Sequence, residues 1–450
     1  MSERNTGRIK RQAVVIIHGM GEQRPMATLR SFVDGITSWI KNFDGTEGTR
    51  PRYWSRPDGI SEIYETRRIT MEQFEGNDKT DFYEFYWAHH MRNTSYNHLV
   101  PWIWKLLSAK YKDIPPRLKF LWGFVWALII VLITAAGIIY YFRNGIIKNL
   151  GITAGVVVAL TVLIKIIHWL FKVPISQMFL NTAGDAARYF NPMPSNIEER
   201  STIRREGIAF LKKLHSNKEK PYDRIVVVGH SLGSVVAYDM LRLLWQEMYQ
   251  QFEPVPDPDH KVFDEMDEKS AGKSSIDNIQ DFQDLQHRCW QQYHKNGNPW
   301  LITDFITCAG AIAHADFFLL NNIPFEKLVS QKEFPTSPPV MEGTDKTLFF
   351  DRKTYTTKDA AGNDVIRTVR YLNHAALFAV TRWTNIYFTS DFVGSEAKRI
   401  FKNGIKDIEV PRKGPFFLPG GHTNYWDNEK DNEALAQIAK AIGFRQLKKT

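Results

Sequence analysis

The chain has 450 residues, 58 lysines and arginines against 49 aspartates and glutamates, and only two cysteines, Cys289 and Cys308. Its hydrophobic content of 43% is ordinary for a globular protein, which argues against a wholly disordered chain. Two cysteines without a CxxC motif argue against a disulfide framework and a structural zinc site, and they favour a reducing compartment. The net charge of +9 suits an anionic partner, either a nucleic acid or an acidic membrane surface.

The first part of the chain predicts two buried strands separated by a helix. Residues 12–17 predict a buried strand, and their apolar run, 13–17, is too short for a secretory signal, so we expect a cytoplasmic location. A helix is expected over about residues 26–41, and the alternating, aromatic-rich stretch 81–87 predicts another strand. His89 and His90 follow. Neighbouring residues of a strand point to opposite faces, so we predict no metal site there.

Two long apolar runs then predict a membrane hairpin. Residues 120–142 carry no charge, and as a helix they reach about 35 Å, enough to cross a hydrocarbon core of about 30 Å. The second run, residues 150–171, is interrupted by Lys165 and His168 near one end. The alternatives are a pair of buried core helices and a hairpin that dips into one leaflet.

The distribution of cations around the hairpin predicts its orientation. The link between the runs holds Arg143 and Lys148. More cations flank the runs on the other side, namely Lys105, Lys110, Lys112, Arg117 and Lys119 before them and Lys172 after them. By the positive-inside rule the flanks lie in the cytoplasm. The same clustering favours a membrane bilayer over nucleic acid as the partner, and it predicts an integral membrane protein whose catalytic body faces the cytoplasm.

The rest of the chain alternates between strand and helix patterns. Helices are expected over about 196–214, 232–249 and 429–442, the last ended by Gly443, and strands over 223–228, 301–313 and 384–389. This alternation predicts an α/β fold with a mostly parallel sheet flanked by helices. The expected organisation is an N-terminal part at 1–117, the transmembrane hairpin at 118–172, and the remainder at 173–450 with a polar, cap-like insertion at 252–298. Residues 324–371 have no assignment.

The strand at 223–228 leads into Gly229-His230-Ser231-Leu232-Gly233, a G-x-S-x-G motif. A strand that turns abruptly into a helix brings the positions two before and two after the serine together, so both must be glycines. Ser231 then projects as a nucleophile, and the Leu232 amide faces a developing oxyanion. The alternative is a serine that only caps a helix.

The first strand ends in a second motif, His18-Gly19-Met20-Gly21. The amide of Gly19 or Met20 is the expected second oxyanion donor. The sequence lacks the GxxxxGK[ST] and GxGxxG patterns of phosphate-binding loops. The alternative is a plain turn that ends the strand, and we interpret His18 as structural rather than catalytic.

Together, these motifs resemble the α/β-hydrolase superfamily on its lipase and esterase side. The resemblance implies a triad in the order serine, acid, histidine, with the acid after a later strand. Asp391 follows the strand pattern at 384–389, and His422 lies in a glycine-rich loop before the last helix. The alternatives for the acid are Asp316 and Asp407. His314 and His374 also follow the serine but precede Asp391.

The sequence therefore predicts a membrane-anchored serine hydrolase that cleaves a carboxylic ester or thioester through an acyl-enzyme, without a cofactor. A location at the membrane suggests a lipid or phospholipid acyl ester as substrate, or a protein-linked acyl chain. The alternatives are a catalytically silent hydrolase-fold scaffold and a membrane-disrupting or pore-forming effector that uses the hairpin. The sequence does not specify an oligomeric state.

Overall fold

The structure is a computed structural model of the whole chain. It describes residues 10–20, 24–40, 51–91, 99–119, 188–191, 194–219, 221–251, 261–271, 276–319, 323–340, 350–359, 361–391, 393–412, 420–427 and 432–446. It also describes residue 186 and some of the positions between 122 and 137.

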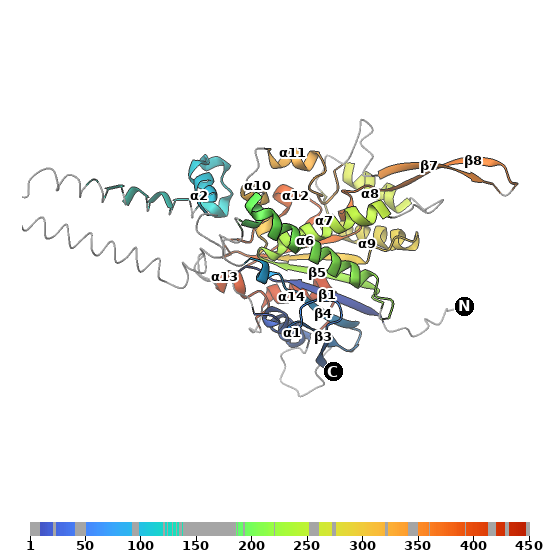
Figure 1. Cartoon of the computed structure of the whole chain (residues 1–450), viewed down its shortest axis with the longest axis horizontal. Helices are drawn as coiled ribbons and strands as arrows, with labels where there is room; N and C mark the ends of the chain where they lie inside the picture. Colours follow the sequence, from blue (N-terminus) through green and yellow to red (C-terminus); the bar gives the residue numbers. More distant parts are fainter. Residues whose placement is uncertain are drawn as a thin grey trace, which may run out of the picture. The chain divides into compact units, whose positions relative to one another are not determined.

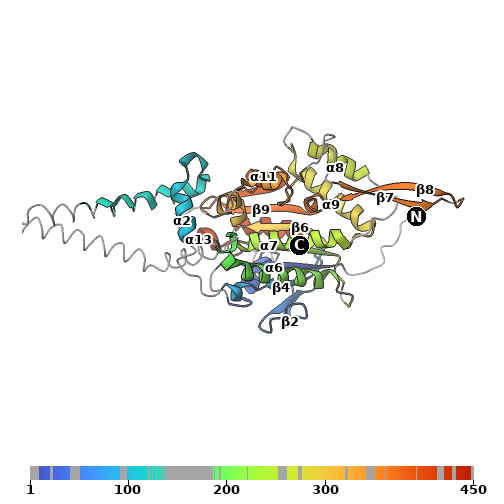
Figure 2. The same cartoon turned by 45° about the horizontal axis from the view of Figure 1, so that its top comes forward.

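An eight-stranded sheet organises the main part of the chain, with the order β10-β9-β6-β5-β1-β4-β3-β2. Figure 2 labels β9, β6, β4 and β2 of this sheet. Its strands are β1 (Arg11–Ile17), β2 (Tyr53–Pro57), β3 (Arg67–Met71), β4 (Lys79–Phe85), β5 (Arg224–His230), β6 (Ile302–Cys308), β9 (Arg382–Phe388) and β10 (Ile405–Val410). The pairs from β4 through β1, β5, β6 and β9 to β10 are parallel. Only β3 and β2 add antiparallel pairs, at one edge. The predicted mostly parallel sheet is confirmed.

Helices cover both faces of this sheet (Figure 1). One face carries α1 (Ala27–Ile40) and α14 (Glu433–Ile442), and the other carries α6 (Pro194–His215), α7 (Gly233–Gln251) and α9 (Ile279–Lys295). Strand residues such as Val14, Val226 and Ile306 are fully buried in the core shared with α1 and α14. Because both of their faces are buried, β1 and β5 carry continuous apolar runs, at 13–17 and 225–228. That is why they can be predicted from the sequence.

Shorter elements connect these layers. They are α8 (Lys261–Ala271), α10 (Ala315–Phe318), α11 (Phe325–Ser330), α12 (Lys398–Phe401), α13 (Gly420–Thr423), the 3-10 helices η1 (Ala88–His90), η5 (Ala311–His314) and η6 (Leu377–Ala379), and a separate hairpin of β7 (Phe350–Lys358) and β8 (Asp364–Leu372). Except for Leu372, the hairpin and α11 lie in the stretch 324–371, which had no assignment from sequence.

Two stretches differ from their predicted form. The strand expected over 301–313 ends at Cys308, because Ala309 adopts a positive φ of 52° and a 3-10 helix follows. The polar stretch 252–298 contains α9, which packs on β9 and β10 and buries one face that includes Phe282, Leu285 and Cys289. These apolar positions recur at helical spacing, but the stretch as a whole is polar. Its average composition therefore did not indicate a helix that covers the sheet.

A second compact unit comprises residues Met91–Pro192 and Phe317–Leu320. Its described elements are α2 (Leu99–Ser108), η3 (Tyr111–Asp113) and η4 (Pro116–Leu118). Apart from some positions between 122 and 137, the predicted membrane hairpin lies outside the described residues. Within the part of the chain that is described, no helix combines the length and apolarity needed to cross a bilayer.

The contact between α1 and the loop before α14 gives a prediction about stability. A Cβ atom on Gly35, in the interior of α1, would lie 2.3 Å from the backbone carbonyl oxygen of Trp426. We therefore expect Gly35→Ala to lower the free energy of unfolding by about 1–3 kcal/mol. This loss occurs even though alanine has a higher helix propensity than glycine. Urea denaturation of the full chain in detergent measures this difference.

Gly59→Ala is the matched control, because a Cβ atom on Gly59 would meet no atom within 4 Å. Its free energy of unfolding should stay within about 0.5 kcal/mol of wild type. A Gly35→Ala protein as stable as wild type would contradict the tight approach of the loop to α1.

Candidate active site

The sharp turn after β5 places Ser231 at the carboxyl edge of the sheet. Ser231 has φ 53°, a left-handed backbone conformation that is strained for a residue with a side chain. Its amide donates to the Cys308 carbonyl at 3.0 Å. Its own carbonyl accepts from the Ser234 amide at 3.1 Å, the Ser234 hydroxyl at 2.6 Å and the Ala311 amide at 3.2 Å. These bonds hold the strained turn in one conformation.

The two glycines of the motif are required by close backbone contacts. A Cβ atom on Gly229 would lie 2.8 Å from the Gly233 carbonyl oxygen, so the two positions are as close as the motif predicts. A Cβ atom on Gly233 would lie 2.2 Å from the Ile17 carbonyl oxygen and 2.4 Å from that of His18. The turn therefore packs against the end of β1, where the second motif begins.

The structure brings Ser231, His422 and Asp391 together in one chain of hydrogen bonds. His422 Nε2 lies 2.9 Å from Ser231 Oγ, and His422 Nδ1 lies 3.0 Å from Asp391 Oδ1. Asp391 follows β9 and is fully buried, and His422 lies in α13. An ionised carboxylate only accepts hydrogen bonds. The imidazole therefore carries its proton on Nδ1, and Nε2 is left to accept from the serine hydroxyl.

The Asp391 carboxylate has two further donors. The Tyr425 hydroxyl donates to Oδ2 at 2.7 Å, and the Val393 amide donates to Oδ1 at 2.8 Å. Burial alone raises the pKa of Asp391, but the adjacent His422 and these hydrogen bonds outweigh it, so the net pKa lies below its usual value. Asp391 is therefore ionised at neutral pH and can stabilise a positive charge on His422.

Tyr425 is a site residue that the sequence analysis missed. Its ring is fully buried, and its hydroxyl also accepts a hydrogen bond from the Phe388 amide at 2.9 Å. It thus joins the last residue of β9 to the carboxylate that follows. Nothing in the local sequence distinguishes this tyrosine from other aromatic residues. Its place directly after the His422 loop is the only signal that could have drawn attention to it.

His230, between Gly229 and the serine, holds the backbone of His422 in α13. A carbonyl only accepts, so His230 Nε2 is the protonated nitrogen and donates to the His422 carbonyl at 2.9 Å. Burial, together with the neighbouring His422, lowers the pKa of His230 to about 4. The ring is therefore neutral at pH 7 and keeps the tautomer that this hydrogen bond needs.

The second motif lies directly against the serine. A Cβ atom on Gly19 would be 2.9 Å from Ser231 Cβ. His18 Nδ1 donates to the Gly19 carbonyl at 2.7 Å, and His18 Nε2 accepts from the Trp87 amide at 3.3 Å. In a trans peptide the C=O and the next N–H point in opposite directions. The His18 ring therefore fixes the peptide whose N–H belongs to Met20, and it turns that N–H away from itself.

Two further properties bear on the expected oxyanion donors. The Leu232 amide forms no hydrogen bond with any residue that the structure describes. It precedes α7, so the positive end of that helix dipole lies beside it. Burial lowers the pKa of His18 to about 4, so this ring is also neutral. Its contacts are those of a residue that positions backbone, in line with the structural role expected from sequence.

The alternative acids serve other purposes. Asp316 forms an ion pair with Arg399, with the closest N–O distance 2.6 Å. Asp407 accepts from the Asn385 side chain at 2.6 Å and from the Lys398 amide at 3.0 Å, at the start of α12. Of the three candidate acids, Asp391 is the one that is hydrogen-bonded to His422. Likewise, the Ser231 hydroxyl is paired with His422 rather than with His314 or His374.

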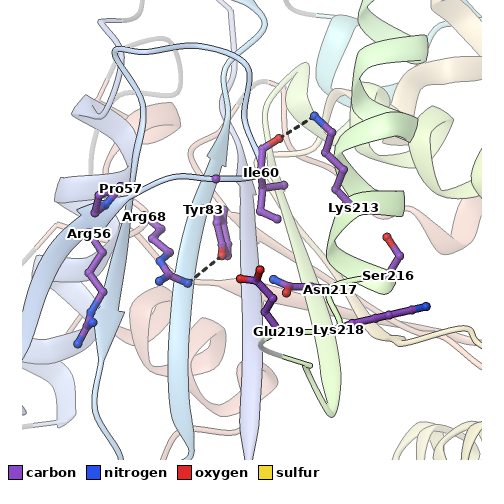
Figure 3. A pocket seen from close by; sticks show the side chains of 11 residues that line it. Arg56, Pro57, Ile60, Arg68, Tyr83, Lys213, Ser216, Asn217, Lys218 and Glu219 are labelled. Atoms are coloured by element: carbon purple, nitrogen blue, oxygen red, sulfur yellow. Dashed lines mark hydrogen bonds between the residues drawn. The ribbon is translucent and has the colours of Figure 1, made fainter.

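A pocket of about 590 Å³ lies between β2, β3, β4 and the end of α6 (Figure 3). Its lining includes four cationic side chains and one carboxylate, namely Arg56, Arg68, Lys213, Lys218 and Glu219. Lys213 is already paired with Glu62 at 2.8 Å, and Arg68 lies 3.4 Å from Asp81. No member of the Ser231–His422–Asp391 chain lines this pocket, so it is separate from the candidate active site.

The reason for predicting no metal at His89 and His90 is wrong. The two residues lie in η1, a 3-10 helix, and not in a strand. Their rings are side by side, with centroids 3.8 Å apart, and do not point to opposite faces. Glu206 of α6 approaches the same place, and His90 Nε2 lies 2.7 Å from its carboxylate. These are the residues of the described chain that could hold a metal ion.

No protein-family model matches the chain, and neither a curated protein nor a solved structure matches it. The chemistry of the site is therefore inferred from its own residues and their geometry.

Tyr425 gives a prediction about the site. Tyr425→Phe should lower the free energy of unfolding by about 1–3 kcal/mol, because it removes a donor to a buried carboxylate and an acceptor for the Phe388 amide. Urea denaturation measures the effect. Tyr64→Phe is the control, since Tyr64 is fully exposed and should change stability by less than about 0.5 kcal/mol. Equal stability of the two variants would contradict the bridging role of Tyr425.

Proposed function

We propose that the protein is a serine hydrolase of the α/β-hydrolase type that cleaves a carboxylic ester through an acyl-enzyme. The observation that carries this proposal is the hydrogen-bonded chain from Ser231 Oγ through His422 to Asp391. The order serine, acid, histidine along the sequence and the strained turn at the serine support it. A residue that only capped a helix would need neither a positive φ nor a histidine in contact with its hydroxyl.

In the proposed reaction, His422 Nε2 removes the proton from the Ser231 hydroxyl as Oγ attacks the ester carbonyl. The tetrahedral intermediate places its negative charge toward the amides of Leu232 and of Gly19 or Met20. His422 then gives the proton to the leaving alcohol, and Ser231 keeps the acyl group. A water molecule, activated by the same imidazole, releases the acid. Asp391 holds the imidazole in the required tautomer and stabilises its positive form. No step requires a cofactor.

We propose further that the substrate is a lipid or phospholipid acyl ester in the cytoplasmic leaflet. This step depends on the two apolar runs at 120–142 and 150–171 and on the cations that flank them. A hydrolase attached to a bilayer meets lipid esters at high local concentration. A protein-linked acyl chain in the same leaflet is the competing substrate class.

Labelling of the full chain with a fluorophosphonate probe tests the nucleophile. Wild type should be labelled, and Ser231→Ala and His422→Ala should lose labelling together with at least about 10³-fold of the hydrolysis of a short acyl ester. Ser330→Ala, which changes an exposed serine outside the site, is the control and should label as wild type does. Labelling that persists in Ser231→Ala, or its absence in folded wild type, would overturn the proposal.

The membrane attachment has its own test. A topology reporter inserted at Gly145, between the two apolar runs, should read as extracytoplasmic, because the flanking cations hold both ends of the hairpin in the cytoplasm. The same reporter fused after residue 450 is the control and should read as cytoplasmic. A cytoplasmic reading at Gly145 would contradict a spanning hairpin. Release of the chain from membranes by alkaline carbonate would contradict integral attachment altogether.

A further inference from the structure

His89, His90 and Glu206 converge from two elements far apart in the sequence. His89 and His90 end η1, and Glu206 lies in the second half of α6. One ligand atom from each of the three residues lies within 4.8 Å of the others. His90 Nε2 and Glu206 Oε2 are 2.7 Å apart. All three residues belong to the sheet-containing unit.

The spacing of these atoms suits a small divalent ion. In a tetrahedral zinc site with ligand bonds of about 2.1 Å, neighbouring ligand atoms lie about 3.4 Å apart. That value falls between the His90–Glu206 separation of 2.7 Å and the 4.8 Å limit that encloses the whole group. The Glu206 side chain is 41% exposed and that of His90 is 17% exposed. Side-chain rotation alone can therefore adjust the distances, and solvent can deliver an ion.

The donor set fits zinc better than magnesium or calcium. Two imidazole nitrogens and one carboxylate are ligands of zinc and of other late first-row metals, whereas magnesium and calcium take oxygen ligands. Three protein ligands leave a fourth position for water. We propose that His89, His90 and Glu206 form a zinc-binding site.

The place of the site in the chain suggests what the ion does. His89 and His90 immediately precede residues 91–192, which form the bulk of the second unit, and α6 begins directly after them, at Pro194. Zinc would thus fasten together the two segments at which the chain leaves and re-enters the sheet-containing unit. The His89 ring also stacks on Tyr86 at 5.6 Å, and Tyr86 contacts the His18 ring at 5.3 Å. Through these ring contacts, the ion would restrict the movement of His18, which holds the Gly19 turn that lies against Ser231.

Zinc binding to the full chain in detergent tests the proposal, with a purification tag that contains no histidine. After removal of metal by a chelator and dialysis against micromolar zinc, wild type should retain about one zinc ion per chain, measured by elemental mass spectrometry. Zinc should also raise its thermal midpoint. Glu206→Gln and His90→Gln should each weaken zinc binding by at least about tenfold, since even loss of an outer partner costs that much.

Glu198→Gln, an exposed carboxylate on the same helix, is the matched control and should bind zinc as wild type does. The metal-free thermal midpoint of Glu206→Gln should equal that of wild type, which separates loss of a ligand from loss of the fold. Full zinc retention by both ligand variants would show that the ion binds elsewhere. No binding to folded wild type would show that the cluster is only a hydrogen-bonded histidine–glutamate pair.

Discussion

The close approach of the turn after β5 to the end of β1 is the constraint on which the candidate site depends. The backbone at Gly233 is so near the Ile17 and His18 carbonyls that only a hydrogen atom fits between them. This contact sets the start of α7 and the position of Ser231. It also sets the distance from the serine to the turn that carries Gly19 and Met20. Parallel strands end at the same edge of a sheet, so β9 delivers Asp391 to the same place.

Neutral buried histidines surround the one that contacts the serine. Burial keeps the pKa values of His18 and His230 at about 4, so neither ring is charged at neutral pH. Each uses a defined tautomer to hold a backbone carbonyl, that of Gly19 or that of His422. A positive charge on either ring would oppose protonation of His422. The site therefore contains three imidazoles, of which His422 contacts the Ser231 hydroxyl and the other two hold backbone carbonyls.

The sequence was sufficient where a residue type is dictated by its immediate neighbours. The buried strands β1 and β5 could be predicted because both faces of each are covered, and Ser231 because its turn requires glycine on both sides. Asp391 and His422 were found by their order along the chain. By contrast, β2 is largely exposed and carries no apolar pattern, so it was missed. Tyr425 acts on a carboxylate that the fold alone brings near, and η1 was mistaken for a continuation of β4.

The left-handed backbone at Ser231 makes a serine less favourable than a glycine for the stability of this turn. At φ 53° a side chain costs about 1–2 kcal/mol that glycine does not incur. The alanine variant keeps that strain, whereas a glycine variant relieves it and removes the hydroxyl at the same time. For the proposed hydrolase, Ser231→Gly is therefore the more stable variant in which to trap an uncleaved ester.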